Sequence, residues 1–307
     1  MLTILLATYN GGKHLPAQLD SLLAQTYTNF QIHILDDAST DRTWHILQEY
    51  RASHPNKINI ARNETNSGSA MNNFFKLITT VKDKYVMLCD QDDIWMPDKI
   101  ETTMIKMREL ERANPWTPVL VHTDLAVVDE NLNIIHPSYR ELTKRDYAKK
   151  DLRQILTINN ASGCTLMYNQ KLAELITQVP KTCLMHDWWL KLVATLFGVV
   201  GHVETSTILY RQHGRNACGA KDVGKFGYKL QRLFNHKELK ETLHNTCKQA
   251  GCLLEIYGSR LTDEQRHLLT EYAQIPSRSK LGRIITLKRL GISMPGLSRN
   301  MALILFI

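Results

Sequence analysis

Residues 85–93 read YVMLCDQDD, and this stretch decides the fold that we expect. Five apolar or aromatic residues have the length of a buried strand, and three aspartates follow them within four positions. Ligands of open α/β sheets bind at the carboxyl ends of the strands, so the aspartates indicate a functional edge. Crowded carboxylates repel one another unless a cation compensates, and hard oxygen ligands favour Mg²⁺ or Mn²⁺. The alternative is a solvated acidic turn that caps the next helix.

The sequence on both sides of this stretch alternates between two hydrophobic periods. Leu15, Leu19, Leu22 and Leu23 fall on one face of a helix between two apolar runs. This β-α-β-α order predicts an α/β fold with a mainly parallel central sheet covered by helices on both faces. The strands expected are 2–9, 30–35, 58–61, 85–89, a hairpin of 119–128 with 133–136, 163–168 and 203–211, with a helix over 186–197.

The chain divides by charge into a neutral front and a basic end. Its net charge is +8, and residues 221–307 alone carry 15 Lys/Arg against 7 Asp/Glu, a difference of 8. Only helical patterns follow residue 220, so we expect a catalytic domain over 1–220 and a basic helical region over 221–307. The sequence contains no run of about 18 apolar residues, so we expect no membrane-spanning helix. Six cysteines without a CxxC pair favour reduced thiols and a cytoplasmic location.

Two further segments carry groups suited to chemistry. Residues 36–41, DDASTD, follow the second predicted strand, where a carboxylate can accept hydrogen bonds from a ribose or a base. Helix capping by Ser39 is the equal alternative. No GxGxxG follows the first strand, which argues against a dehydrogenase.

Later in the chain, Asp187 stands beside two tryptophans, where restricted water access suits a general base, although a helix N-cap fits equally well. At the end of the last predicted strand, Arg211 can pair with a phosphate and His213 can ligate a metal. A hydrogen-bonded polar histidine is the alternative for His213.

Taken in order, these motifs resemble family 2 glycosyltransferases, inverting enzymes with the GT-A fold. The matching stretches are 7–11 (ATYNG), 22–27 (LLAQTY), 35–41 (LDDASTD), 66–68 (NSG) and 90–93 (DQDD). Residues 89–95, 186–189 and 210–214 resemble the branch that contains bacterial polysaccharide rhamnosyltransferases.

The resemblance implies a role for each matching position. Asp187 takes the place of the catalytic base, and Asp90, Asp92 and His213 would hold Mn²⁺ or Mg²⁺. The QxxRW motif of processive synthases is missing after Asp187, which implies transfer of a single sugar. The residues expected at the donor are Thr8, Tyr9, Asn10, Asp37, Asn66, Gly68, Asp90 and Arg211.

The implied function is a metal-dependent inverting glycosyltransferase. It would move one sugar from a dTDP- or UDP-sugar, with L-rhamnose from dTDP-β-L-rhamnose as first choice, to a lipid-linked saccharide of a cell-surface polysaccharide. Two alternatives stay open: a nucleotidyltransferase that makes sugar nucleotides, and a non-catalytic polysaccharide-assembly module. The segment 10–13, NGGK, only faintly resembles the glycine-rich loop of the former. The intact acidic loop and Asp187 speak against the latter.

The C-terminal residues 275–307 form a basic amphipathic pattern. Five cations alternate with leucines and isoleucines, and no acidic residue follows Glu271. We therefore expect peripheral attachment to the anionic inner face of the plasma membrane. The alternative is packing on the catalytic domain or against a second copy in a homodimer. Nucleic acid is not expected, because Phe306 is the only aromatic residue of this segment.

Overall fold

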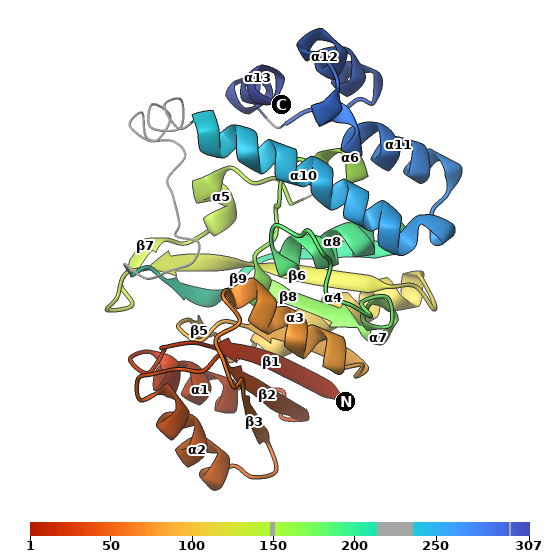
Figure 1. Ribbon diagram of the computed structural model, residues 1–307. Coiled ribbons are helices and arrows are strands. Elements are labelled where there is room, and N and C mark those ends of the chain that lie inside the picture. The colour runs from red at the N-terminus through yellow and green to blue at the C-terminus, as the bar shows by residue number, and fades with distance from the viewer. Residues whose placement is uncertain (148–150, 214–235, 295) are drawn as a thin grey trace.

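The computed structural model describes residues 1–147, 151–213, 236–294 and 296–307. The predicted domain boundary at 220–221 lies outside these residues. A nine-stranded sheet forms the centre of the described chain (Figure 1). The strands are β1 (Leu2–Thr8), β2 (Phe30–Asp36), β3 (Ile58–Arg62), β4 (Tyr85–Cys89), β5 (Ile94–Trp95), β6 (Val119–Val128), β7 (Ile134–His136), β8 (Leu166–Asn169) and β9 (Val199–Arg211).

The sheet is mixed but mostly parallel, as predicted. The strand order is β3-β2-β1-β4-β8-β6-β9-β5, and β7 pairs with β6. Strands β1 to β4 run parallel to their neighbours in that group. Strand β8 is antiparallel to both β4 and β6, so β6 and its parallel neighbour β9 share the direction of β1. Strands β5, β7 and β8 run the opposite way.

Helices cover both faces of the sheet, which confirms the predicted layering. One apolar cluster joins the sheet to α1, α2 and α4, and the other joins it to α3, α8 and the C-terminal helices. The α-helices are α1 (Leu15–Leu23), α2 (Thr43–Ser53), α3 (Ala70–Thr80), α4 (Lys99–Ala113), α5 (Tyr139–Thr143), α6 (Leu152–Ile155), α7 (Gln170–Ala173), α8 (His186–Phe197), α10 (His236–Tyr257), α11 (Asp263–Ala273), α12 (Lys280–Arg289) and α13 (Leu297–Phe306). Short 3₁₀ turns span Gly163–Thr165, Gly258–Arg260 and Ile275–Ser277.

Helix α3 shows how local sequence determines an element that borders the site. The Ser69 side chain accepts a hydrogen bond from the Asn72 amide and so caps the helix. Phe74, Phe75 and Ile78 fall on one face and are at most 1% exposed. Each such side chain contributes about 1.5–3 kcal/mol by burial, so this face fixes α3 on the sheet.

Three local expectations were wrong in detail. Strand β9 begins at Val199, four residues before the expected start at residue 203. Ser39 does not cap α2, because its hydroxyl is bound to the Asp36 carboxylate instead. The expected strand over 163–168 opens with a 3₁₀ turn, and strand pairing starts at Leu166.

The C-terminal helices share the core of the α/β part. Leu253 of α10, Leu269 of α11 and Leu287 of α12 lie in the same apolar cluster as Phe74 and Trp189. Figure 1 shows α10 crossing over α8, with α12 and α13 beyond it. Among the described residues, no helix combines the length and apolar character needed to cross a membrane.

Candidate active site

A cavity of about 400 Å³ opens at the carboxyl ends of β1, β2 and β4. This is the edge at which the acidic stretch was expected to act. Most of the residues singled out in the sequence line it, and Asn10, Arg211 and His213 do not. Those in the lining are Thr8, Tyr9, Asp37, Asn66, Gly68, Asp90, Asp92 and Asp187.

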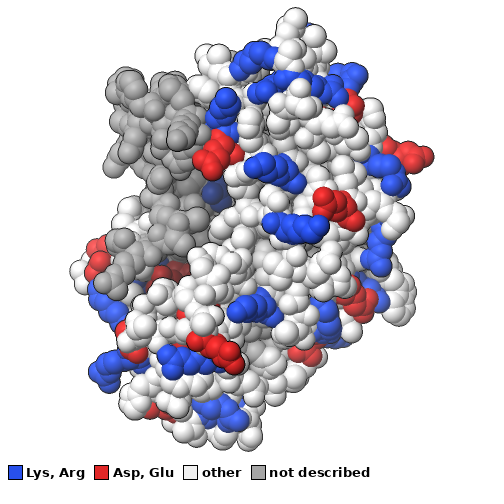
Figure 2. Space-filling view, in the orientation of Figure 1, with Lys and Arg blue, Asp and Glu red and all other residues white. Residues whose placement is uncertain are grey.

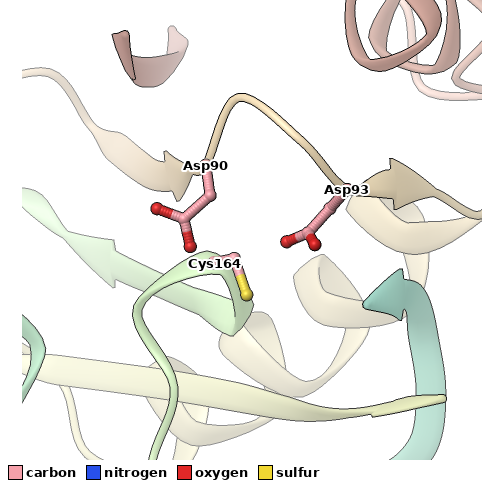
Figure 3. A group of neighbouring side chains, drawn as sticks. All are labelled: Asp90, Asp93 and Cys164. Carbon is pink, nitrogen blue, oxygen red and sulfur yellow. The ribbon is translucent and has the colours of Figure 1, made fainter. Parts of the chain in front are cut away.

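The loop after β4 gathers acidic groups around a buried thiol. Ligand atoms of Asp90, Asp93 and Cys164 lie within 4.8 Å of one another, and both carboxylates lie on the same side of the loop, beside Cys164 (Figure 3). Asp93 is fully buried, and none of the residues that the structure describes forms a hydrogen bond to its Oδ2. Burial raises the pKa of Asp90 to about 7, and the negative charges of Asp92 and Asp187 add to the rise. The carboxylate oxygens of this group suit Mg²⁺ or Mn²⁺, whereas the Cys164 thiol is a soft donor that these cations do not favour. Of the three predicted metal ligands, the group contains Asp90 but not Asp92 or His213.

A buried lysine lies beneath the acidic loop. Lys99 is 0% exposed, and its Nζ lies 4.6 Å from the centre of the Trp95 ring. Within the described part of the chain, this Nζ has no hydrogen-bond partner. Burial lowers the pKa of Lys99 to about 8, while the nearby Cys164, Cys89 and Asp93 oppose that shift. Its positive charge therefore partly offsets the carboxylates above it.

Arg211, the last residue of β9, and His213, two residues after it, both contact the acidic loop. The Arg211 amide donates to Asp93 Oδ1 at 3.3 Å, and its guanidinium donates to the backbone oxygens of Asp92 at 3.0 Å and Glu130 at 2.7 Å. His213 Nε2 lies 2.8 Å from Asp92 Oδ2. His213 thus reaches one of the proposed metal-binding carboxylates, whereas Arg211 lies against the loop backbone.

At the other end of the cavity, Asp37 organises the turn before α3. Its Oδ1 accepts from the Ser67 amide at 2.8 Å and from Asn63 Nδ2 at 2.6 Å, and its Oδ2 accepts from the Ser67 hydroxyl at 2.7 Å. Asn66 closes the turn by donating to the Asp37 carbonyl and accepting from the Gly68 amide. Gly68 has φ +87°, a conformation that a side chain would strain, so the glycine keeps this wall in place.

Gln91 joins this end of the cavity to the acidic loop. Its Oε1 accepts from the Tyr9 amide at 2.8 Å, and its Nε2 donates to the Tyr9 carbonyl at 3.0 Å. The Tyr9 side chain stays 48% exposed beside the cavity, where its ring is free to stack on a base. Asn10 instead ties β1 to the loop after β2, because its Oδ1 accepts from the Thr40 amide at 2.8 Å.

Asp187 lies in the first turn of α8 with one carboxylate oxygen held and the other available. Its Oδ1 accepts from Asn159 Nδ2 at 3.0 Å and from the Trp188 amide at 2.6 Å. Asn159 is itself oriented, since its Oδ1 accepts from the Ala161 amide at 3.1 Å. The described residues provide no hydrogen-bond donor to Asp187 Oδ2. A fixed carboxylate with one free oxygen in a cavity can accept a proton from a bound hydroxyl.

Sequence reasoning did not assign Gln91, Asn159, Arg145 or Lys99 to the site. Gln91 stood within the acidic motif and could have been singled out there. Asn159 and Arg145 line the cavity from an irregular segment with no recognisable motif, so no local pattern marked them.

Comparisons with known proteins show what this chain is similar to in sequence. The model of the family described as glycosyl transferase family 2 matches residues 3–176. The dTDP-rhamnosyl transferase RfbG of Shigella flexneri is 30% identical over 247 residues, which cover 76% of this chain and 80% of that protein.

Two solved structures are similar in fold. The crystal structure of S. aureus TarS 1–349 in complex with UDP-GlcNAc superposes with a TM-score of 0.59 at 15% identity, covering 94% of this chain and 80% of that one. The mannosyltransferase PcManGT of Pyrobaculum calidifontis, in complex with GDP-Man and Mn²⁺, gives a TM-score of 0.55 at 15% identity, covering 94% and 72%.

Proposed function

Since this chain belongs to glycosyl transferase family 2 and is a glycosyltransferase, we propose that it moves one L-rhamnose from dTDP-β-L-rhamnose to a saccharide acceptor. The observation that carries the choice of sugar is its similarity to a dTDP-rhamnosyl transferase over 76% of the chain. The cavity supports the reaction class, because Tyr9, Asp37, Asp90, Asp92 and Asp187 all line it.

Asp187 is the proposed general base. Asn159 and the Trp188 amide fix its Oδ1, so Oδ2 faces the acceptor hydroxyl and takes its proton. The acceptor oxygen then attacks the anomeric carbon while the bond to the nucleoside diphosphate breaks on the opposite face. One displacement inverts the configuration, and a β-linked donor gives an α-rhamnoside.

The proposed donor site spans the turn at Asp37 and the acidic loop. Tyr9 would stack on the base, and Asp37 and the Asn66–Gly68 turn would shape the nucleoside end. Asp90, Asp92 and His213 would hold Mn²⁺ or Mg²⁺. A divalent ion at this position stabilises the negative charge that develops on the leaving diphosphate. Arg211 would keep the loop in place, and its expected contact with the donor stays a prediction.

We further propose that the C-terminal helices bind an anionic membrane surface on the cytoplasmic side. Leu281 and Ile285 of α12 and Leu305 of α13 are 67%, 56% and 53% exposed, an apolar area at the end of the molecule. Lys280 and Lys288 are exposed on the same pair of helices. Figure 2 shows Lys and Arg side chains gathered over α12 at the top of the molecule. Apolar groups flanked by cations suit a leaflet that carries acidic lipids.

The C-terminal helices also pack on the α/β part of the chain, which is the alternative that the sequence left open for residues 275–307. Leu287, Leu290 and Ile307 are buried in the shared core. Arg278 pairs with Glu271, and Arg283 donates to backbone carbonyl oxygens. Fewer cations therefore face the solvent than the five that the sequence suggested. A lipid-linked acceptor at the inner face of the plasma membrane would give this surface its purpose, and the division into 1–220 and 221–307 remains our proposal.

The test of the function is donor turnover. The protein is incubated with dTDP-β-L-rhamnose, UDP-GlcNAc or GDP-mannose and Mn²⁺, and the released nucleoside diphosphate is measured with and without saccharide acceptors. Release of dTDP that requires Mn²⁺ supports the proposal. Preference for another donor would refute the choice of rhamnose but not the glycosyltransferase reaction. Nucleoside triphosphate formed on adding pyrophosphate would favour a nucleotidyltransferase, and no turnover of any donor would favour a non-catalytic module.

A further inference from the structure

The cavity holds one guanidinium among several carboxylates. Asp37, Asp90, Asp92 and Asp187 line it, and Arg145 is the cationic side chain of the described lining. Substrates that carry phosphate bring further negative charge into the same space. A cation on the wall would lower the electrostatic cost of binding them.

An aromatic ring, rather than a carboxylate or carbonyl group of the described residues, positions the Arg145 side chain. Its guanidinium carbon lies 4.9 Å from the centre of the Tyr139 ring, in a cation–π contact. Tyr139 in turn meets the ring of Tyr210 edge-on, with centroids 6.0 Å apart, and all three residues line the cavity. The described residues give the guanidinium nitrogens neither a hydrogen bond nor an ion pair. Its donors are therefore available to a ligand.

The segment that carries Arg145 is anchored on both sides of it. The buried Asp124 accepts from the Ser138 hydroxyl at 2.5 Å and from the Tyr147 hydroxyl at 3.4 Å. Arg299 of α13 also donates to the Thr143 carbonyl at 3.0 Å. These contacts hold the backbone on both sides of Arg145, so little conformational freedom is lost when its side chain binds.

We propose that Arg145 binds a phosphate group of a substrate within the cavity. A planar guanidinium pairs with phosphate through two parallel N–H···O bonds, and an aromatic face behind it leaves that edge free. The inference rests on the proposed function, which supplies two sources of phosphate. One is the diphosphate of the donor, and the other is a phosphate through which the acceptor saccharide is linked. Arg145 thus adds a substrate-binding residue to the set expected from the sequence.

The first experiment tests the donor as the source. Arg145→Gln and Arg145→Lys are compared with Lys144→Gln, a control that removes one charge from the exposed neighbouring residue. The Kd of dTDP, UDP and GDP with Mn²⁺ is measured by calorimetry. If the donor diphosphate is the ligand, Arg145→Gln weakens the best nucleotide at least about 10-fold. The Kd of Arg145→Lys should lie between those of the parent and Arg145→Gln, because an ammonium group cannot form the two parallel hydrogen bonds of a guanidinium. The Kd of Lys144→Gln should equal that of the parent.

The second experiment tests the acceptor side with inorganic phosphate as the probe. Phosphate is added to the parent with and without saturating nucleoside diphosphate and Mn²⁺, at an ionic strength balanced with sodium chloride. If an acceptor phosphate is the ligand, phosphate raises the Tm of the nucleotide-bound parent and of Lys144→Gln but not of Arg145→Gln.

The proposal is overturned if Arg145→Gln matches the parent in both experiments. It is also overturned if Arg145→Gln lowers the Tm of the ligand-free protein but matches Lys144→Gln both in nucleotide affinity and in the Tm increase caused by phosphate. Failure of the proposed function is recognised separately, because a parent that binds no nucleoside diphosphate shows it without any variant. In that case the inference is tested without nucleotide: phosphate should raise the Tm of the parent but not that of Arg145→Gln, and an equal rise in both would overturn it.

Discussion

Lowering the pH from about 7.5 to about 6 should weaken Mn²⁺ binding at the acidic loop. Burial raises the pKa of Asp90 to about 7, with Asp92 and Asp187 adding their charges, while the metal binds only the ionised carboxylate. With a pKa of about 7, the ionised fraction of Asp90 is about 0.76 at the higher pH and about 0.09 at the lower. The Kd for Mn²⁺ should therefore rise about 8-fold. A carboxyl with an ordinary pKa near 4 would leave Kd unchanged in this range.

The assay is titration with Mn²⁺ without nucleotide, because a phosphate with a second pKa of about 6 would add its own pH dependence. Free Mn²⁺ is followed by its paramagnetic resonance signal. Calorimetry in two buffers gives the protons released per ion, which should be more at pH 6 than at pH 7.5. His213→Gln separates the carboxyl from the neighbouring imidazole, since glutamine does not titrate, and it should keep the pH dependence.

The raised pKa of Asp90 also affects the folding stability of the metal-free protein. Because the folded protein holds the Asp90 proton up to about pH 7 and the unfolded chain releases it near pH 4, the folded state binds more protons between these values. The contribution of Asp90 to the free energy of unfolding therefore falls as the pH rises through that window, and Mn²⁺ restores it. A Kd that is the same at both pH values, together with no proton release, would refute this account of the loop.

Four substitutions test other parts of the site. Asp187→Asn should transfer sugar at least about 100-fold more slowly while binding dTDP like the parent; full activity would leave Asp187 as a helix-capping residue. Asn159→Ala, which removes one bond from Oδ1 of that base, should lower kcat about 10-fold with an unchanged KM for the donor, and a change confined to KM would contradict the positioning role. Asp92→Asn should abolish Mn²⁺-dependent donor binding and keep or raise the Tm of the metal-free protein, because it removes repulsion; unchanged Mn²⁺ dependence would remove Asp92 from the metal site. The pair Leu281→Ser and Ile285→Ser, both on the exposed face of α12, should reduce co-sedimentation with anionic vesicles at unchanged donor hydrolysis, whereas equal sedimentation would rule the membrane surface out.

The sequence by itself determined the elements and the edge at which the site forms. Helix periodicity and buried apolar runs are local properties, so β4 was predicted with its observed bounds and α8 likewise. The sequence also predicted that Asp90 and Asp92 follow β4 directly and lie at the edge of the sheet where the cavity opens. This could be predicted because the end of a strand is recognised from the local sequence alone. The ordered motifs were specific enough to indicate the family.

Only the tertiary structure decided how distant residues meet. Strand β8 enters the sheet antiparallel between β4 and β6, which no periodicity specifies. Arg211 had the chemistry to bind phosphate, but contacts with residues 118 and 119 positions earlier in the chain turn it onto the backbone of the acidic loop. Tertiary packing likewise brings Asn159 into contact with Asp187 and places Arg145 in the lining of the cavity. The physical reason is that pairing across such separations depends on the packing of the whole sheet, whereas local sequence constrains only neighbours within a few residues.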